Sequence, residues 1–241
     1  MRIRIGVLVA GEPPAELRGR HAGYGVMTEQ LLRAEDPELE FVRYEVRNGE
    51  FPHTIDDNDA YLITGSRHGA YEELPWIRQL AQLVCEIEKQ RKPLVGICFG
   101  HQLIARALGG VVEKAAQGWG VGVHTATLLA PAPWMEEQTG DFSLVVSHQD
   151  QVLRLPERAE LIAGSTFCPV AMFRIADHVF AMQAHPEFSR EYSRDLMELR
   201  RELIGVGQID AGLESLGRNI DSARVARWIV EFLHRALAPG S

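Results

Sequence analysis

The chain has 241 residues, of which 46% are hydrophobic and 24% are charged, and its formal net charge is −8. This composition is ordinary for a globular protein with a core of normal size. An acidic surface without Lys- and Arg-rich runs repels phosphate backbones, so we do not expect nucleic acid as a partner. The three cysteines, at irregular spacing, match neither a disulfide framework nor a zinc ligand pattern, which favours a reducing, cytoplasmic setting and no bound metal.

The N-terminus carries an apolar run, Ile3 to Val9, preceded by basic residues. This run is too short to span a membrane. It breaks at Gly11 to Pro14 without a small-residue cleavage site, which argues against a signal peptide. A buried first strand is the better interpretation, and we expect no membrane association.

Strand-like and helix-like segments alternate over the first hundred residues. The expected strands are Ile3–Val9, Phe41–Val46, Ala60–Thr64 and Leu94–Ile97, and the expected helices are Tyr24–Ala34 and Pro75–Lys92. The second helix begins with proline, which suits a first helical position, and repeats apolar residues at helical spacing. Such alternation is typical of a parallel sheet with helices on both faces.

From about Val111 to Met182 the pattern changes to short β-rich runs. These are Val121–Leu129, Phe142–Ser147, Leu161–Gly164, Val170–Ile175 and Val179–Gln183. They predict an antiparallel extension of the same sheet, and two final helices are expected at about Ser189–Leu203 and Ser222–Leu237. Nothing marks a domain boundary, so we expect one α/β domain over residues 1–241, with a mostly parallel central sheet flanked by helices.

A glycine-flanked cysteine stands between the fourth expected strand and the helix after it. Gly96 and Gly100 lie two residues before and after Cys98, as in a tight strand–turn–helix where larger neighbours would clash. The N–H groups and dipole of a helix N-terminus stabilise a thiolate and can hold an oxyanion. We therefore interpret Cys98 as a nucleophile. Cys85 and Cys168 lack such glycines and are expected to be structural.

The base is sought among nine histidines. His185 follows an apolar strand, and Glu187 stands two residues later, so both side chains project to one side if the extended backbone continues. Glu187 would then fix the imidazole tautomer and leave the other nitrogen for the thiol. His101 is expected to point along the new helix, and His234 lies in the last helix. Surface positions are expected for His21, His53, His68, His124 and His178.

Two of these segments resemble the motifs of class I (triad) glutamine amidotransferases. Gly96–Gln102, GICFGHQ, resembles the family's nucleophile motif, and Gln183–Phe188, QAHPEF, resembles its His-Pro-Glu motif, about ninety residues later. The resemblance extends from about Ile63 to Phe188. The nearest branch looks like stand-alone proteins similar to the glutaminase domain of GMP synthase, and plant γ-glutamyl peptidases resemble that branch too. A flavodoxin-like class I amidotransferase fold is implied.

The resemblance also implies residues around the triad. The N–H groups of Gly65 and Phe99 would form the oxyanion hole, and Gln102 would contact the bound substrate. The segment resembling the one that holds the substrate's α-amino and α-carboxyl groups is Ser147, His148, Gln149 and Asp150. Many relatives have glycine where Gln149 stands, so a side chain here would narrow the pocket or add a contact.

The implied reaction is hydrolysis of the γ-amide of glutamine or a related γ-glutamyl compound through a γ-glutamyl thioester. It releases glutamate and ammonia or an amine, and it needs no metal or organic cofactor. The sequence lacks a Gly-x-x-x-x-Gly-Lys-Ser/Thr loop, so we do not expect ATP chemistry. Two alternatives stay open: a glutaminase subunit delivering ammonia to a synthetase partner, and a non-catalytic binding or chaperone-like module on the same fold.

Overall fold

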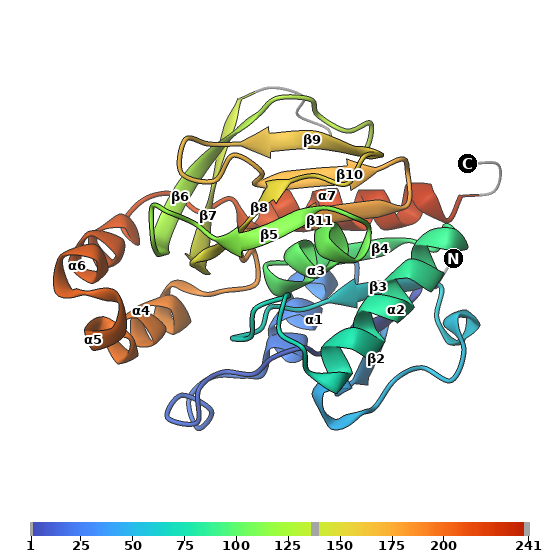
Figure 1. Cartoon of the computed structure of the whole chain (residues 1–241), viewed down its shortest axis with the longest axis horizontal. Coiled ribbons are helices and arrows are strands. Elements are labelled where there is room, and N and C mark those ends of the chain that lie inside the picture. The colour runs from blue at the N-terminus through green and yellow to red at the C-terminus, as the bar shows by residue number, and fades with distance from the viewer. Residues whose placement is uncertain (1, 136–139, 239–241) are drawn as a thin grey trace.

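The architecture is built on one large twisted sheet (Figure 1). The computed structural model describes residues 2–135 and 140–238. Nine strands follow the order β2-β1-β3-β4-β11-β10-β9-β6-β7, and β5 and β8 form a separate two-stranded sheet. The strands are β1 (Arg4–Leu8), β2 (Glu40–Tyr44), β3 (Ala60–Ile63), β4 (Leu94–Ile97), β5 (Val111–Lys114), β6 (Gly120–Leu128), β7 (Asp141–His148), β8 (Asp150–Arg154), β9 (Ala159–Gly164), β10 (Met172–Ile175) and β11 (Val179–Met182).

Half of the large sheet is parallel, and this half positions the candidate site. β2, β1, β3, β4 and β11 run parallel, whereas β10, β9, β6 and β7 continue the sheet in antiparallel pairs. Every residue of β3, β4 and β11 is buried, as expected for parallel strands covered on both faces. In the register, Ile63 faces Gly96 and Met182 faces Ile97. The carboxyl ends of three neighbouring strands therefore meet at one edge.

Helices cover both faces of the parallel half (Figure 1). On one face, α2 (Pro75–Lys89) and α3 (Phe99–Ala107) bury residues such as Leu80 and Ile104 in one apolar cluster. On the other, α1 (Tyr24–Glu35) packs beside α7 (Ser222–Ala236), and α7 buries residues such as Ile229 in a second cluster. Two short 3₁₀ helices, η1 (Val46–Asn48) and η2 (Ile55–Asp57), lie in the connections after β2.

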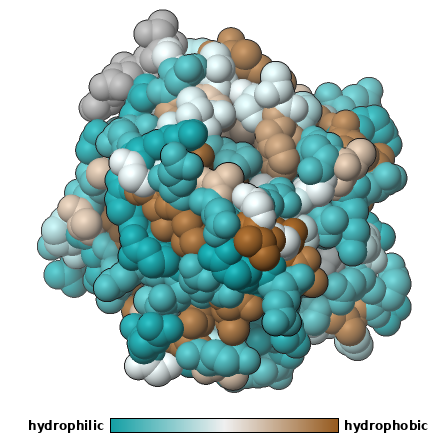
Figure 2. Space-filling view, turned by 90° about the vertical axis from the view of Figure 1, so that its left-hand side faces the viewer, coloured by the Kyte–Doolittle hydropathy of each residue, from teal (hydrophilic) through white to brown (hydrophobic). Residues whose placement is uncertain are grey.

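Three consecutive helices pack at the β6 end of the sheet. They are α4 (Arg190–Leu199), α5 (Arg201–Ile204) and α6 (Val206–Ser215). The buried apolar residues of α4 and α6, including Tyr192 and Leu196, join Val121 of β6 in a third apolar cluster. Figure 2 looks at this end and shows a mostly hydrophilic face with hydrophobic side chains in separate patches. No helix of residues 2–135 or 140–238 has the length and apolar character needed to cross a membrane.

The predicted α/β class, with a mostly parallel sheet and an antiparallel extension, is confirmed. β5 and β8 were not predicted, and neither was α6. The predicted helix over 189–203 instead ends at Leu199, and α5 follows it. The surface position predicted for His178 is wrong: this residue lies in the turn between β10 and β11, beside Glu88 of α2, and is 3% exposed.

Candidate active site

Cys98 lies where β4 passes directly into α3. It precedes the first residue of α3, and its backbone has φ 51° and ψ −98°, a conformation that costs a non-glycine residue energy and is concentrated at functional sites. A methyl group on Gly96 would lie 2.8 Å from the carbonyl carbon of Gly100, and one on Gly100 would lie 2.5 Å from the backbone oxygen of Ile63. Both glycines therefore let the turn pack tightly enough to hold the cysteine in this conformation.

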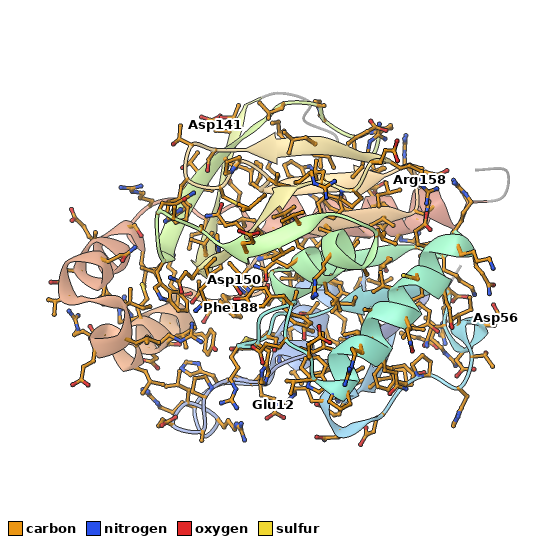
Figure 3. All side chains as sticks on the ribbon, in the orientation of Figure 1. Glu12, Asp56, Asp141, Asp150, Arg158 and Phe188 are labelled. Carbon is orange, nitrogen blue, oxygen red and sulfur yellow. The ribbon has the colours of Figure 1, made fainter. Side chains whose placement is uncertain are left out.

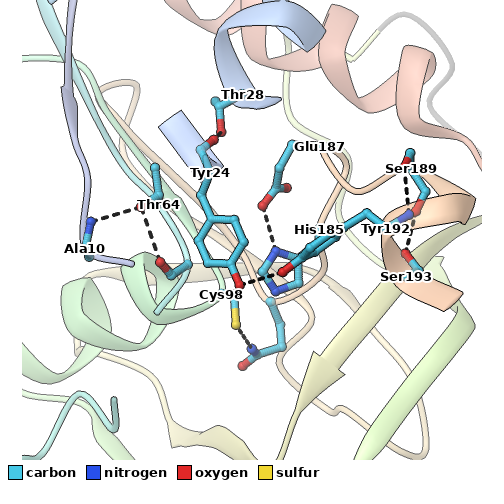
Figure 4. A network of polar contacts seen from close by, with 12 residues as sticks. Ala10, Tyr24, Thr28, Thr64, Cys98, His185, Glu187, Ser189, Tyr192 and Ser193 are labelled. Carbon is cyan, nitrogen blue, oxygen red and sulfur yellow. Dashed lines mark hydrogen bonds and ion pairs between the residues drawn. The ribbon is translucent and has the colours of Figure 1, made fainter. Parts of the chain in front are cut away.

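His185 and Glu187 form a buried hydrogen-bonded pair next to Cys98 (Figure 4). His185 Nδ1 lies 2.7 Å from Glu187 Oε1, and the two side chains are 4% and 0% exposed. Because an ionised carboxylate only accepts, Nδ1 donates and the other ring nitrogen is left for the thiol. The Phe188 ring stacks on the imidazole with centroids 3.9 Å apart, and the His185 N–H donates to the Val145 carbonyl at 2.8 Å. Ring and backbone are thus both fixed.

The electrostatics around His185 favour the imidazolium. Burial by itself lowers the pKa of His185, but the Glu187 carboxylate and the Cys98 sulfur beside it outweigh burial and raise that pKa to about 10. A raised pKa keeps the ring protonated at neutral pH, and a positive ring favours an adjacent thiolate. This arrangement can supply a nucleophile and a proton donor together.

Two backbone N–H groups are available near the thiol. Within the described part of the chain, no group accepts a hydrogen bond from the N–H of Gly65 or of Phe99. Gly65 follows β3 closely, and a methyl group on it would lie 2.8 Å from His185 Cε1 and 3.8 Å from Cys98 Cβ. Phe99 N–H belongs to the first residue of α3, where a helix offers no internal acceptor. Both groups are therefore suited to receive an oxyanion.

A chain of side-chain amides runs from the segment after β7 to the cysteine. Gln102 Nε2 donates to the Asp150 carbonyl at 2.9 Å and to Gln183 Oε1 at 3.1 Å. Gln183 Nε2 in turn lies 3.6 Å from Cys98 Sγ and donates to it. Because a backbone carbonyl can only accept, the Gln102 atom that faces the Asp150 carbonyl must be the amide nitrogen. This nitrogen also donates to Gln183 Oε1, so Gln183 turns its own amide nitrogen toward the sulfur.

A cavity of about 560 Å³ opens over this arrangement and is lined by Cys98 and His185. Gln102, Ser147, His148, Gln149 and Asp150 also line it, so the structure brings these predicted residues together. Asp150, the first residue of β8, and Phe188, another lining residue, are labelled near each other in Figure 3. Glu187 does not line the cavity; it lies behind His185 and hydrogen-bonds the ring at Nδ1.

The family model described as glutamine amidotransferase class-I matches residues 23–202. The chain belongs to the class I glutamine amidotransferases. This is a family of enzymes, and its matched region contains Cys98, His185 and Glu187.

Relatives of this chain include plant peptidases. Gamma-glutamyl peptidase 3 of Arabidopsis thaliana is 35% identical over 64% of this chain and 66% of its own length. Gamma-glutamyl peptidase 4 of the same plant is 33% identical over 80% of this chain and 79% of its own length. The glutamine-hydrolysing GMP synthase of Aeropyrum pernix is 31% identical over 59% of this chain but only 26% of its own length.

A solved structure agrees with the fold of this chain. The crystal structure of a glutamine amidotransferase from Thermotoga maritima has a TM-score of 0.75, with 98% of both chains covered and 22% identity. At 22% identity, the similarity to this structure supports the fold and not a shared function. It matches the α/β architecture predicted from the sequence.

The thiols of Cys85 and Cys168 have raised pKa values. Burial raises the pKa of the Cys168 thiol to about 12, and burial together with the acids Glu88 and Glu86 raises the pKa of the exposed Cys85 thiol. Neither is a thiolate at neutral pH. No cluster of three or more potential metal ligands occurs among the described residues.

Residues without a predicted role also belong to the site. Gln183 lies inside the His-Pro-Glu motif, and its place directly after β11 was a usable signal. Arg200 lines the cavity and donates from Nη1 to Ser147 Oγ at 2.9 Å. Tyr24, from α1, also lines the cavity and hydrogen-bonds Tyr192 at 2.8 Å. Arg200 and Tyr24 carry no sequence signal, because only the tertiary fold brings α1 and α4 to the cavity.

Proposed function

We propose that the chain hydrolyses the γ-amide of glutamine or of a related γ-glutamyl compound through a thioester on Cys98. The observation that carries the proposal is the constellation of Cys98 in its strained turn beside the His185–Glu187 pair, at the base of a cavity. The names of the relatives, γ-glutamyl peptidases and a glutamine-hydrolysing synthase, support the same bond as the target.

In the first half of the proposed reaction, the Cys98 thiolate attacks the γ-carbonyl carbon. The carbonyl electrons move to oxygen, which the N–H groups of Gly65 and Phe99 receive. The tetrahedral intermediate then collapses, the bond from carbon to nitrogen breaks, and the departing nitrogen takes a proton from the His185 imidazolium. The products are a γ-glutamyl thioester and ammonia or an amine. Preorganised oxyanion donors of this kind are typically worth about 10²–10³ in kcat each.

In the second half, water attacks the thioester. His185, now neutral, takes a proton from the water, and the same N–H groups receive the second oxyanion. Collapse releases glutamate and restores the thiolate beside a protonated ring. Glu187 stays ionised throughout and stabilises each imidazolium state through its bond to Nδ1.

We further propose that the chain turns over without a partner protein. The support is the state of the oxyanion donors: among the described residues, no group accepts from the N–H of Gly65 or Phe99, and Gly65 lies close to both His185 and Cys98. A glutaminase subunit that waits for a synthetase is the alternative, and the GMP synthase relative is the observation that favours it.

The test is release of glutamate and ammonia from glutamine and from γ-glutamyl dipeptides by the purified chain. We expect turnover by the wild type and none by Cys98→Ala. Equal turnover by both would reject the proposed nucleophile. No turnover by the wild type, with Cys98 still open to electrophiles, would reject partner independence and favour a gated subunit. No turnover combined with an unreactive Cys98 would favour a non-catalytic module.

A further inference from the structure

The charged groups around the cavity are unequally neutralised. Two of its cations have an acid nearby: Arg67 acts electrostatically on Glu72, and Lys114 acts on Asp150. Arg200 also lines the cavity but pairs with no carboxylate among the described residues. The cavity therefore contains one guanidinium whose charge the described protein leaves without a counterion.

The hydrogen bond and the ring contact that the Arg200 side chain makes with described residues are both with neutral groups. Its Nη1 donates to Ser147 Oγ at 2.9 Å, and its Cζ lies 5.7 Å from the ring centroid of Trp119. A guanidinium has five N–H donors, so most of its donors stay available after these contacts. Its sequence neighbour Arg201 behaves differently, because it pairs with Glu198 and Asp210 outside the cavity.

The position of this cation decides what it can bind. Arg200 is the residue directly after α4, partly buried, and it shares the cavity with the Cys98 sulfur. Leaving a partly buried charge unpaired is unfavourable, and the planar guanidinium fork matches a carboxylate with two parallel hydrogen bonds. The missing partner is thus an anionic group of the ligand whose amide reaches Cys98.

We propose that Arg200 binds a carboxylate of the substrate, with Ser147 and Trp119 holding its guanidinium in place. The inference rests on the proposed function. Two carboxylates have this chemistry: the α-carboxylate of the γ-glutamyl group, and the carboxylate of an amino acid that leaves as the amine. The two carboxylates can be distinguished by which ligands require Arg200 for binding.

The test is calorimetric binding to the Cys98→Ala chain, so that no turnover is needed. The ligands are glutamine, a γ-glutamyl dipeptide and a γ-glutamyl anilide; the dipeptide alone has a carboxylate on its leaving group. Arg200→Gln removes the charge. Arg194→Gln removes the same charge from an exposed position of α4 and is the matched control.

We expect Arg200→Gln to weaken binding by about tenfold or more, the loss of one charge-assisted hydrogen bond, and Arg194→Gln to leave it unchanged. Equal weakening for all three ligands assigns the α-carboxylate, and weakening for the dipeptide alone assigns the leaving-group carboxylate. Unchanged binding of every ligand, or no binding with Arg200 intact, would overturn this inference. The proposed function fails by a different result, namely turnover that survives Cys98→Ala.

Discussion

Glu187→Gln is the substitution whose effect can be calculated most directly. Glutamine keeps an oxygen that can accept from His185 Nδ1, now at 2.7 Å, but it removes the negative charge. Charged hydrogen bonds contribute about 1.5–3 kcal/mol and neutral ones about 0.5–1.5 kcal/mol, so the imidazolium loses about 1–1.5 kcal/mol of stabilisation. Because one pKa unit corresponds to about 1.4 kcal/mol, the pKa of His185 should fall by about one unit and kcat/KM by about tenfold.

The assay is glutamate release by Glu187→Gln, with an NMR titration of the His185 ring as a second readout. His185→Asn should lose far more activity, because it removes the proton donor itself. Glu191→Gln is the matched control: it removes the same charge from an exposed position in the first turn of α4. A Glu187→Gln enzyme with wild-type kcat/KM and an unshifted His185 pKa would show that the orienting group lies elsewhere.

Three further results follow from the geometry. Gly65→Ala places a methyl group 2.8 Å from His185 Cε1 and should lower kcat by about 10²-fold. Gly207→Ala is the control, because its methyl group meets nothing within 4 Å and should leave kcat unchanged. Equal kcat values for the two variants would refute the close approach of Gly65 to His185. Gln183→Leu removes a donor to Cys98 Sγ and should slow alkylation of Cys98 at neutral pH by about tenfold, and an unchanged rate would reject this role. The folded-state pKa of His185 is raised from 6.5 to about 10, so the stability it contributes is present below pH 6.5 and lost as pH rises toward 10. With Cys98 in place, the free energy of unfolding should fall across this window more steeply than in His185→Asn, and parallel curves would contradict the raised pKa.

Much of the parallel half of the fold could be predicted because its signals are local. β3, β4 and β11 are short, fully apolar runs, and α2 repeats apolar residues at helical spacing after a proline. β5 is different, since three of its four residues are not buried and it ends with Glu113 and Lys114. Its pairing with β8 depends on a partner distant in sequence, so a local pattern does not reveal it.

Positions in the candidate site were predictable to the extent that the backbone alone fixes them. Cys98 and His185 follow neighbouring parallel strands, so a correct strand assignment brings them to one edge. The course of α4 is set by packing of residues such as Leu196 against β6, and this packing brings Arg200 to the cavity. The charge balance of the cavity is therefore a tertiary property, which periodicity and spacing do not encode.

The most direct test of the central claim is to treat the whole chain with a glutamine-like electrophile at neutral pH and map the adduct by mass spectrometry. The pKa of the exposed Cys85 thiol is raised, and the pKa of Cys168 is raised to about 12. The most exposed cysteine should therefore not be the one that reacts. We predict one adduct, on Cys98, lost in His185→Asn and suppressed by excess glutamine. An adduct on Cys85 or Cys168 with Cys98 unmodified would contradict the account.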